Sequence, residues 1–337
     1  MRKHVLSFLA FLFSVQLYAQ VKDVNKQPLT PQQVSERLLL QYKAIAFLPV
    51  KPESLDHIFE SRKKEAAMPI PKLTNADSVS VKYTKIPGLN ASDPEIPIRI
   101  YKSKNITKGP IYLMFHGGGF VTGNLNWDHQ RCANIAQHAG VIVINVDYRL
   151  APENPFPAAL NDAYASLLWA VKHADEFDGD TAHVAVAGIS AGAALAGSIV
   201  WKARDEHGPR ITAQILEVPP ADADTAYISV RDFYNFPALK GSDLPFFLKI
   251  YVGEANTKYP LPKYALPGLI NDVHGLPTTL IETCGADPLR DGGLAYAIRL
   301  IQAGIKTELL NYPGLPHGAF MPGYDEVLYR FINTFLK

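Results

Sequence analysis

The sequence predicts an α/β fold in which a mainly parallel sheet is covered by helices on both faces. The first observation is alternation: from residue 111 onward, short apolar runs alternate with longer segments of helical spacing, which is the pattern of β-α-β units. The second is that two of the apolar runs end in glycine-rich turns. The third is composition, because 337 residues of which 47% are hydrophobic and 19% charged suffice for a large core.

The first twenty residues have the order of a secretory signal peptide. Arg2 and Lys3 precede an apolar stretch from Val5 to Val15, and Ala19 is a small residue at the expected cleavage position. The stretch is too short to span a bilayer comfortably, and a retained anchor or a buried helix is the alternative. Cleavage after residue 19 takes Lys+Arg from 33 to 31 against 32 acidic residues, a net charge of −1. We therefore expect an exported protein, periplasmic or secreted.

Residues 30–68 are expected to be helical. Thr30 and Pro31 form a typical helix start, and apolar residues then recur at helical spacing as far as Phe59. From Val79 the period changes to alternation, over 79–83 and again over 96–100, which predicts two strands with one exposed face. The chain thus divides into a signal peptide (1–19), an N-terminal helical segment (20–78) and an α/β domain (79–337).

The remaining elements follow in alternation. Strands are predicted at 111–115, 141–146, 183–187, 211–218, 278–283 and 307–312, and helices at 126–139, 155–174, 191–204, 294–303 and 324–336. Residues 219–266 interrupt this rhythm with 9 aromatic residues and several prolines. Such an insert either covers a binding site or packs as a surface excursion, and the two are compatible.

Composition and spacing exclude several classes of protein. A net charge of +1 without a basic run argues against a nucleic-acid binder. The only cysteines, Cys132 and Cys284, cannot form a disulfide scaffold, and we expect two free, buried thiols. His116, His129 and His138 lack a metal-ligand spacing such as H-E-x-x-H, so we expect neither a metal nor another cofactor.

A glycine-flanked serine stands between a predicted strand and a predicted helix, in Gly188-Ile-Ser-Ala-Gly192. A serine on such a tight turn exposes its hydroxyl, and the small neighbours let strand and helix approach each other. The alternative is a glycine-rich turn that only packs the helix. The strand–turn–helix context makes Ser190 the candidate nucleophile.

A run of three glycines, in His116-Gly-Gly-Gly-Phe120, follows another predicted strand. Consecutive glycines let backbone N–H groups point at an anion, which is what stabilising a developing oxyanion requires. A dinucleotide-binding loop is excluded, because Thr122 stands where the last glycine of G-x-G-x-x-G belongs. A plain flexible turn remains the alternative.

A nucleophilic serine needs a base and an acid that orients the base. His317 lies just after the last predicted strand, and Asp287 lies just after the strand that ends near residue 283. Open α/β sheets bind ligands at the carboxyl ends of their strands, so we expect these residues to meet Ser190 there. Asp291 is the rival for the acid position.

The segment from Asp147 to Glu153 follows the strand predicted at 141–146. We expect Arg149 and Glu153 to pair and to hold this loop as scaffold, without taking part in chemistry.

Taken together, these motifs resemble the hormone-sensitive-lipase-like esterases, family IV of the α/β-hydrolase superfamily. The resemblance covers roughly residues 79–337 and rests on motifs in family order at 116–120, 148–153, 188–192, 287–291 and 317–318. It implies an α/β-hydrolase fold with a cap built from the N-terminal helices and the insert at about 219–266. Ile189, Ala193, Ala194 and Gly292 depart from the family's usual residues, which leaves the subfamily and the acyl pocket open.

The resemblance also implies roles for individual residues. Ser190 is implied as nucleophile, His317 as base and Asp287 as the acid that orients it. The implied backbone donors to the oxyanion are Gly117, Gly118 and Ala191.

The implied activity is that of a serine carboxylesterase acting on small, short-chain (acetyl-like) esters through an acyl-enzyme. For an exported protein an acetylated glycan is a candidate substrate, although no residue identifies a sugar. An amidase or peptidase with the same residues is one alternative. Another is a non-catalytic binding protein: the plant gibberellin receptor resembles this family but lacks the base histidine, which is present here as His317. Neither a nucleic-acid partner nor a membrane span after processing is expected, and the oligomeric state is not predicted.

Overall fold

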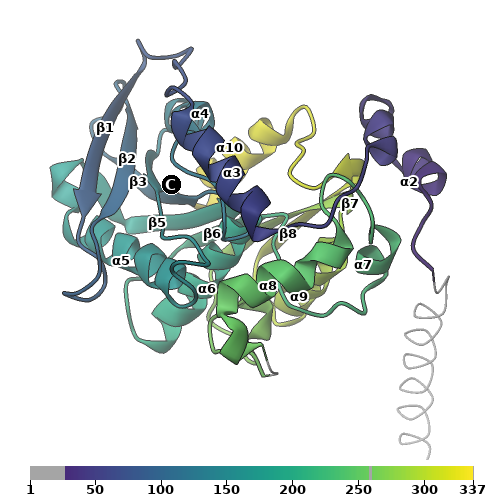
Figure 1. Cartoon of the computed structure of the whole chain (residues 1–337). Helices are drawn as coiled ribbons and strands as arrows, with labels where there is room; N and C mark the ends of the chain where they lie inside the picture. The colour runs from purple at the N-terminus through teal and green to yellow at the C-terminus, as the bar shows by residue number, and fades with distance from the viewer. Residues whose placement is uncertain (1–26, 258–259, 337) are drawn as a thin grey trace, which may run out of the picture.

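The computed structural model describes residues 27–257 and 260–336 (Figure 1). The predicted signal peptide, residues 1–19, lies outside the described residues. In the part of the chain that is described, no helix is both long enough and apolar enough to cross a membrane.

Within these residues, eight strands form one sheet in the order β1-β2-β4-β3-β5-β6-β7-β8. β2 runs antiparallel to both of its neighbours, and the pairs from β4 across to β8 are parallel, which confirms the predicted mainly parallel sheet. The strands are β1 (Val79–Ile86), β2 (Ile96–Ser103), β3 (Gly109–Phe115), β4 (Ile142–Val146), β5 (Gly179–Ile189), β6 (Ala213–Glu217), β7 (Thr278–Ala286) and β8 (Thr307–Pro316).

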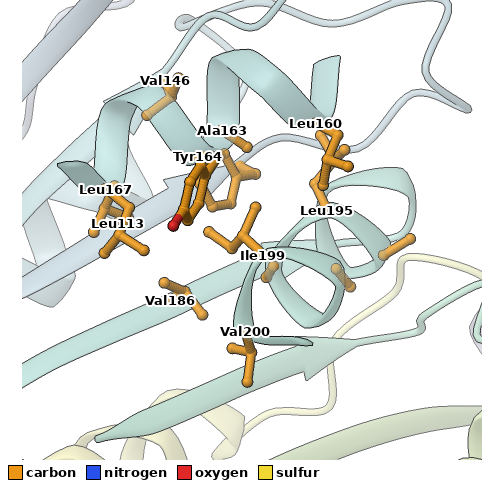
Figure 2. Close-up of a cluster of buried hydrophobic side chains, with 14 of the residues drawn as sticks. Leu113, Val146, Leu160, Ala163, Tyr164, Leu167, Val186, Leu195, Ile199 and Val200 are labelled. Atoms are coloured by element: carbon orange, nitrogen blue, oxygen red, sulfur yellow. The ribbon is translucent and has the colours of Figure 1, made fainter. Parts of the chain in front are cut away.

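Helices cover both faces of the sheet because its central strands are apolar on both sides. In β3, Ile111 and Leu113 face one buried cluster, while Tyr112 and Met114 face the other. The first cluster is completed by α5 (Ala158–Lys172), α6 (Ala191–Asp205) and α9 (Arg290–Gln302), and the second by α4 (His129–Ala139) and α10 (Tyr324–Phe335). Figure 2 shows Leu195 and Ile199 of α6 among the side chains of the first cluster.

The predicted helical segment at 30–68 is interrupted. The structure has α2 (Pro31–Arg37), a 3₁₀ helix η1 (Leu40–Phe47) and α3 (Leu55–Ala67). The start is confirmed, since the Thr30 side chain accepts a hydrogen bond from the Gln33 N–H and α2 begins at Pro31. The continuous extent is wrong at Leu38 and Leu39, whose backbone is extended. It is also wrong at 48–54, where Pro49 and Pro52 cannot donate the helical hydrogen bond.

The insert between β6 and β7 contains two short helices and several 3₁₀ turns. They are α7 (Ile228–Asp232), η3 (Gly241–Asp243), α8 (Leu244–Val252), η4 (Glu254–Asn256) and η5 (Pro267–Leu269), while η2 (Ala174–Glu176) lies elsewhere, before β5. Ile58 of α3 packs in one cluster with Phe246 and Phe247 of α8. The N-terminal segment and the insert therefore contact each other through these side chains.

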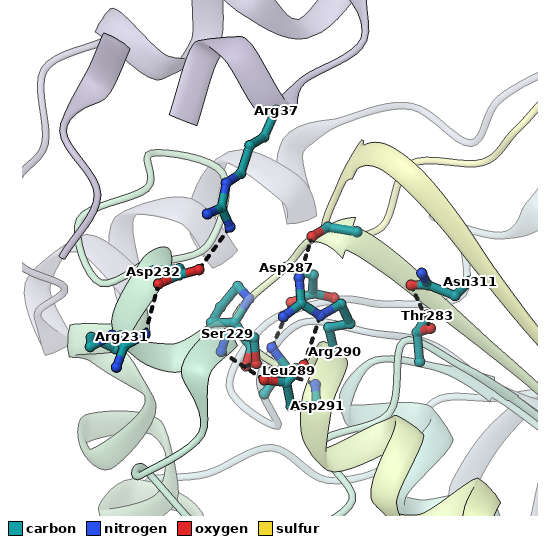
Figure 3. A network of polar contacts seen from close by, with 12 residues as sticks. Arg37, Ser229, Arg231, Asp232, Thr283, Asp287, Leu289, Arg290, Asp291 and Asn311 are labelled. Atoms are coloured by element: carbon teal, nitrogen blue, oxygen red, sulfur yellow. Dashed lines mark hydrogen bonds and ion pairs between the residues drawn. The ribbon is translucent and has the colours of Figure 1, made fainter. Parts of the chain in front are cut away.

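The first of the described residues are tied to α7 of the insert and to β8. The Leu29 N–H donates to the Asp232 carbonyl at 3.3 Å, and Arg37 Nη1 lies 2.7 Å from Asp232 Oδ2 (Figure 3). The Leu39 N–H donates to the Gly314 carbonyl of β8 at 3.0 Å. α2 thus contacts the insert at α7, whereas α3 contacts it at α8. Arg62 of α3 also donates to the Val121 carbonyl, directly after the glycine loop (116–120).

Candidate active site

Ser190 lies in the turn between β5 and α6. Its φ of +54° is unfavourable for a residue with a side chain and is typical of a serine on a sharp strand-to-helix turn. A Cβ at Gly188 would lie 2.2 Å from the carbonyl carbon of Gly192, and one at Gly192 would lie 2.0 Å from the carbonyl oxygen of Phe115. The start of α6 therefore approaches both β5 and the end of β3 closely only because both positions are glycine. The Ser190 N–H donates to the Glu217 carbonyl at 2.8 Å, which ties the turn to β6.

The structure brings Ser190, His317 and Asp287 together. His317 Nε2 lies 2.9 Å from Ser190 Oγ, and His317 Nδ1 lies 2.8 Å from Asp287 Oδ2. The Asp287 side chain is fully buried, and the His317 side chain is 14% exposed. The Leu289 N–H donates to Asp287 Oδ1 at 2.9 Å, so one carboxylate oxygen is held by backbone while the other faces the imidazole. The arrangement suits proton transfer from the serine to the histidine.

Asp291, the rival acid, faces a different set of partners. Its Oδ2 accepts the Ser229 N–H at 2.8 Å, and its Oδ1 lies 2.7 Å from Arg290 Nε (Figure 3). Asp291 is in the first turn of α9, and Ser229 is in α7. Its contacts join α9 to the insert, and the carboxylate that contacts His317 is that of Asp287.

The glycine loop after β3 lies directly against the serine turn. A Cβ at Gly117 would be 3.2 Å from the Ile189 carbonyl oxygen and 3.5 Å from Ser190 Cβ. The N–H groups of Gly117 and Gly118 make no hydrogen bond within the described residues. Ala191 is the first residue of α6, where backbone N–H groups have no partner inside the helix. The three predicted donors thus border the serine on two sides.

An aromatic contact between His116 and Tyr148 supports the glycine loop. The His116 ring stacks on the Tyr148 ring at a centroid distance of 4.2 Å, and the Tyr148 hydroxyl donates to the His116 carbonyl at 2.7 Å. Burial lowers the pKa of His116 to about 4, so the imidazole is neutral at neutral pH. His116 therefore supports the loop without adding positive charge beside the predicted donors Gly117 and Gly118.

The predicted pairing of Arg149 with Glu153 is wrong. Arg149 Nη2 lies 2.7 Å from Asp162 Oδ1, and its Nη1 lies 3.0 Å from Asp93 Oδ1. Asp162 is buried in α5, where a bidentate guanidinium is the partner that best compensates burial. Glu153 instead accepts from Arg62 Nη1 of α3, at 2.8 Å to each carboxylate oxygen. The loop is held as expected, but Glu153 ties it to the N-terminal segment.

A pair of buried glutamates lies beneath the site. Glu217 and Glu282 are opposite each other in the β6–β7 register. Arg131 Nη1 lies 2.6 Å from Glu217 Oε2, and the Tyr324 hydroxyl also donates to Glu217. Both oxygens of Glu282 lack a hydrogen-bond partner in the described structure, and burial, followed by the charge of Glu217, raises the pKa of Glu282 to about 9. The neutral form of Glu282 is thereby favoured, which limits the negative charge near Asp287.

Sequence reasoning missed this pair, although a signal was present. A glutamate in the apolar run of β7 is unexpected in a buried strand, and so is one at the end of β6. The free cysteines are confirmed: Cys132 and Cys284 are both reduced and buried. Within the described residues, no group of three or more His, Cys, Asp or Glu side chains is arranged to hold a metal ion.

Ser190 and His317 open into a cavity of about 1050 Å³. Its walls come from the glycine loop, the start of α4, α3 and the segment before it, the insert, and the loop after β8. The ring of Phe247 in α8 packs on the glycine loop, since a Cβ at Gly119 would lie 2.9 Å from it. The volume suits a small organic molecule.

Comparison with known proteins finds an alpha/beta hydrolase family model and several proteins named esterases. Residues 112–321 match the family model of the alpha/beta hydrolase fold. The chain is 39% identical to esterase LipI of Mycobacterium tuberculosis over 211 residues, which are 63% of this chain and 66% of LipI. It is 37% identical to carboxylesterase NlhH of the same organism over 227 residues, 66% of this chain and 71% of NlhH. Among solved structures, a bacterial heroin esterase matches with a TM-score of 0.81 and 34% identity, covering 90% of this chain and 99% of that one.

Proposed function

Because this chain belongs to the alpha/beta hydrolase family, among its hormone-sensitive-lipase-like esterases, we propose that it is a serine carboxylesterase that cleaves short-chain esters through an acyl-enzyme on Ser190. The observation that carries the proposal is the hydrogen bond of 2.9 Å between His317 Nε2 and Ser190 Oγ. A base at that distance accepts the hydroxyl proton as the oxygen attacks a carbonyl carbon.

The steps of the proposed reaction follow from the same contacts. His317 takes the proton of Ser190 as Oγ bonds to the ester carbonyl carbon, and Asp287 stabilises the imidazolium that forms. The backbone N–H groups of Gly117, Gly118 and Ala191 receive the negative charge on the carbonyl oxygen. His317 then gives its proton to the leaving alcohol. Water, activated by the same imidazole, breaks the acyl–serine bond and releases the acid.

The preference for a short acyl group is supported by the packing around the glycine loop. Phe247 packs against Gly119, next to the proposed donor Gly118, and lines the cavity. We infer that a bulky acyl chain meets this ring, while the larger remaining volume of the cavity accepts the alcohol part of the ester.

A chain-length series tests substrate class and acyl size together. Rates on p-nitrophenyl acetate, butyrate, octanoate and decanoate are compared with the rate on p-nitroacetanilide. We expect kcat/KM to be highest for acetate or butyrate and to fall by about tenfold or more by octanoate, since each misfitting contact costs about 1–3 kcal/mol. The anilide is expected to react at least about 100-fold more slowly than the acetate ester, a barrier difference of about 2.7 kcal/mol.

Each other outcome contradicts a stated part of the proposal. An anilide that reacts as fast as the ester identifies an amidase, and a maximum at decanoate contradicts the role given to Phe247. If neither the esters nor the anilide react, the fold serves only to bind its ligand.

We also propose that residues 1–19 direct export to the periplasm or beyond the cell. The support is the sequence order of Arg2, Lys3 and the apolar stretch that follows. Expression of the full chain in a Gram-negative host is expected to yield a periplasmic or secreted protein that begins at Gln20, as measured by mass spectrometry. A cytosolic protein that still begins at Met1 contradicts export. Acetylated glycans would then be accessible substrates whose acetyl esters match the proposed acyl size.

A further inference from the structure

The cavity around Ser190 is lined by acidic side chains and, among the described residues, by no lysine or arginine. The carboxylates come from α3 and the segment before it, from the start of α4, and from the insert: Glu53, Glu65, Asp128, Asp222 and Asp224. The basic side chains in its wall are His57 and His317. In the described part of the chain, none of the five carboxylates is ion-paired with lysine or arginine; Glu53 pairs with His57. A pocket that carries one sign of charge concentrates ligands of the opposite sign.

Most of these carboxylates have local partners that explain their positions. Glu65 Oε2 accepts the Gly123 N–H at 3.3 Å. Asp222 accepts the Tyr227 hydroxyl at 2.8 Å, and Asp224 accepts the Ala226 N–H at 2.8 Å. These contacts order the wall of the cavity and require no ligand.

Asp128 is different from the other four. It is only 7% exposed, and its Oδ2 has no hydrogen-bond partner in the described structure. It immediately precedes α4, yet its side chain does not cap the helix. The neighbouring cation, Arg131, directs two of its guanidinium nitrogens to Glu217. The charge of Arg131 also acts on Asp128, but this guanidinium is hydrogen-bonded to Glu217. Because a buried carboxylate is costly, further positive charge brought into this cavity by a ligand would stabilise Asp128.

The residue that precedes Asp128 is aromatic. Trp127 lines the same cavity and is about half exposed. Aromatic faces attract cations and favour alkylated ammonium groups, which are weakly hydrated. Burial raises the pKa of Asp128 to about 6, which still leaves the carboxylate charged at neutral pH.

We propose that Asp128 is an anionic subsite of this cavity and that the substrates include small esters carrying an ammonium group. The inference rests on the proposed esterase function of Ser190 for its catalytic part, but not for its binding part. An ester with a free carboxylate is disfavoured by the same wall, because no lysine or arginine of the described lining compensates its charge.

Two esters of equal shape, of which only one is charged, isolate the effect of a positive charge on kcat/KM. Acetylcholine and 3,3-dimethylbutyl acetate differ in having a quaternary nitrogen or a quaternary carbon, and both release an acetyl group. We expect the intact protein to show a kcat/KM for acetylcholine that is about tenfold or more above that for the carbon isostere, equivalent to about 1.4 kcal/mol. The readout is the ratio of the two kcat/KM values. A general loss of activity in a variant lowers both values and leaves the ratio unchanged.

Two variants locate the effect. Asp128→Asn keeps the size of the side chain and removes its charge, and we expect it to bring the ratio close to one through a higher KM for acetylcholine. Asp175→Asn makes the same change in an exposed residue of η2 outside the cavity and is expected to keep the ratio of the unaltered protein. A ratio of one or less in the unaltered protein, or equal ratios in the two variants, overturns the proposal.

Binding without catalysis separates this inference from the proposed function. Calorimetric titration of Ser190→Ala protein with choline is expected to show binding that 3,3-dimethylbutan-1-ol does not match and that Asp128→Asn abolishes. If choline binds in this way but no ester is hydrolysed by the unaltered protein, the esterase proposal fails and the subsite stands. If p-nitrophenyl acetate is hydrolysed and choline does not bind, the subsite alone fails.

Discussion

Ser190→Ala is expected to lower kcat for p-nitrophenyl acetate by about 10⁵–10⁶-fold with little change in KM. The substitution removes the atom that bonds to the carbonyl carbon, while the glycine loop and His317 remain to bind the ester. Activity is measured by p-nitrophenolate release. Acid-quenched samples of the unaltered protein are expected to carry one acetyl group on the peptide that contains Ser190, and the variant is expected to carry none.

A serine inside the helix that follows Ser190 provides the control. Ser198 is fully buried in α6, and its hydroxyl has no hydrogen-bond partner among the described residues. Ser198→Ala removes an equivalent atom eight positions along the chain and is expected to keep nearly full activity and thermal stability. Full activity in Ser190→Ala, or equal losses in the two variants, contradicts the proposed acyl-enzyme.

The features that the sequence predicts well are those set by local steric rules. The turn at Ser190 is one example, because only glycine at 188 and 192 lets strand and helix meet at the observed separation. The strand ends that carry Asp287 and His317 are another, since short apolar runs mark both strands and a parallel sheet brings their carboxyl ends to one edge. The alternation of strand and helix from residue 111 onward is confirmed for the same reason.

The features that escape prediction depend on contacts between distant segments. Arg149 has Glu153 close by in sequence, but α5 presents the buried carboxylate of Asp162 instead. Asp128 was assigned to a helix predicted at 126–139, whereas α4 begins at His129 and leaves Asp128 at the cavity wall. Arg131 and Glu217 meet across the face of the sheet, a pairing that no local spacing encodes.

The second large effect on kcat is expected at the aspartate that orients His317, for which Asp287 and Asp291 were the two candidates. Asp287→Asn is expected to lower kcat by about 10⁴-fold, because an amide does not stabilise the imidazolium and favours the wrong tautomer of His317. The carboxylate contacts His317 Nδ1 through Oδ2, while its Oδ1 is held by the Leu289 N–H, so the geometry of the site is expected to survive the change. Steady-state hydrolysis of p-nitrophenyl acetate measures the loss.

Asp291→Asn is the matched control, four residues further along the same segment. Its oxygens contact the Ser229 N–H and Arg290, so its removal loosens the junction of α9 with the insert and leaves His317 untouched. We expect activity within about tenfold of the unaltered protein and a stability loss of about 1–3 kcal/mol, read from thermal melts. If Asp291→Asn loses as much kcat as Asp287→Asn while both proteins stay folded, the acid that orients His317 has been assigned to the wrong residue. If only Asp287→Asn is impaired, the orienting charge acts through the 2.8 Å contact with His317 Nδ1.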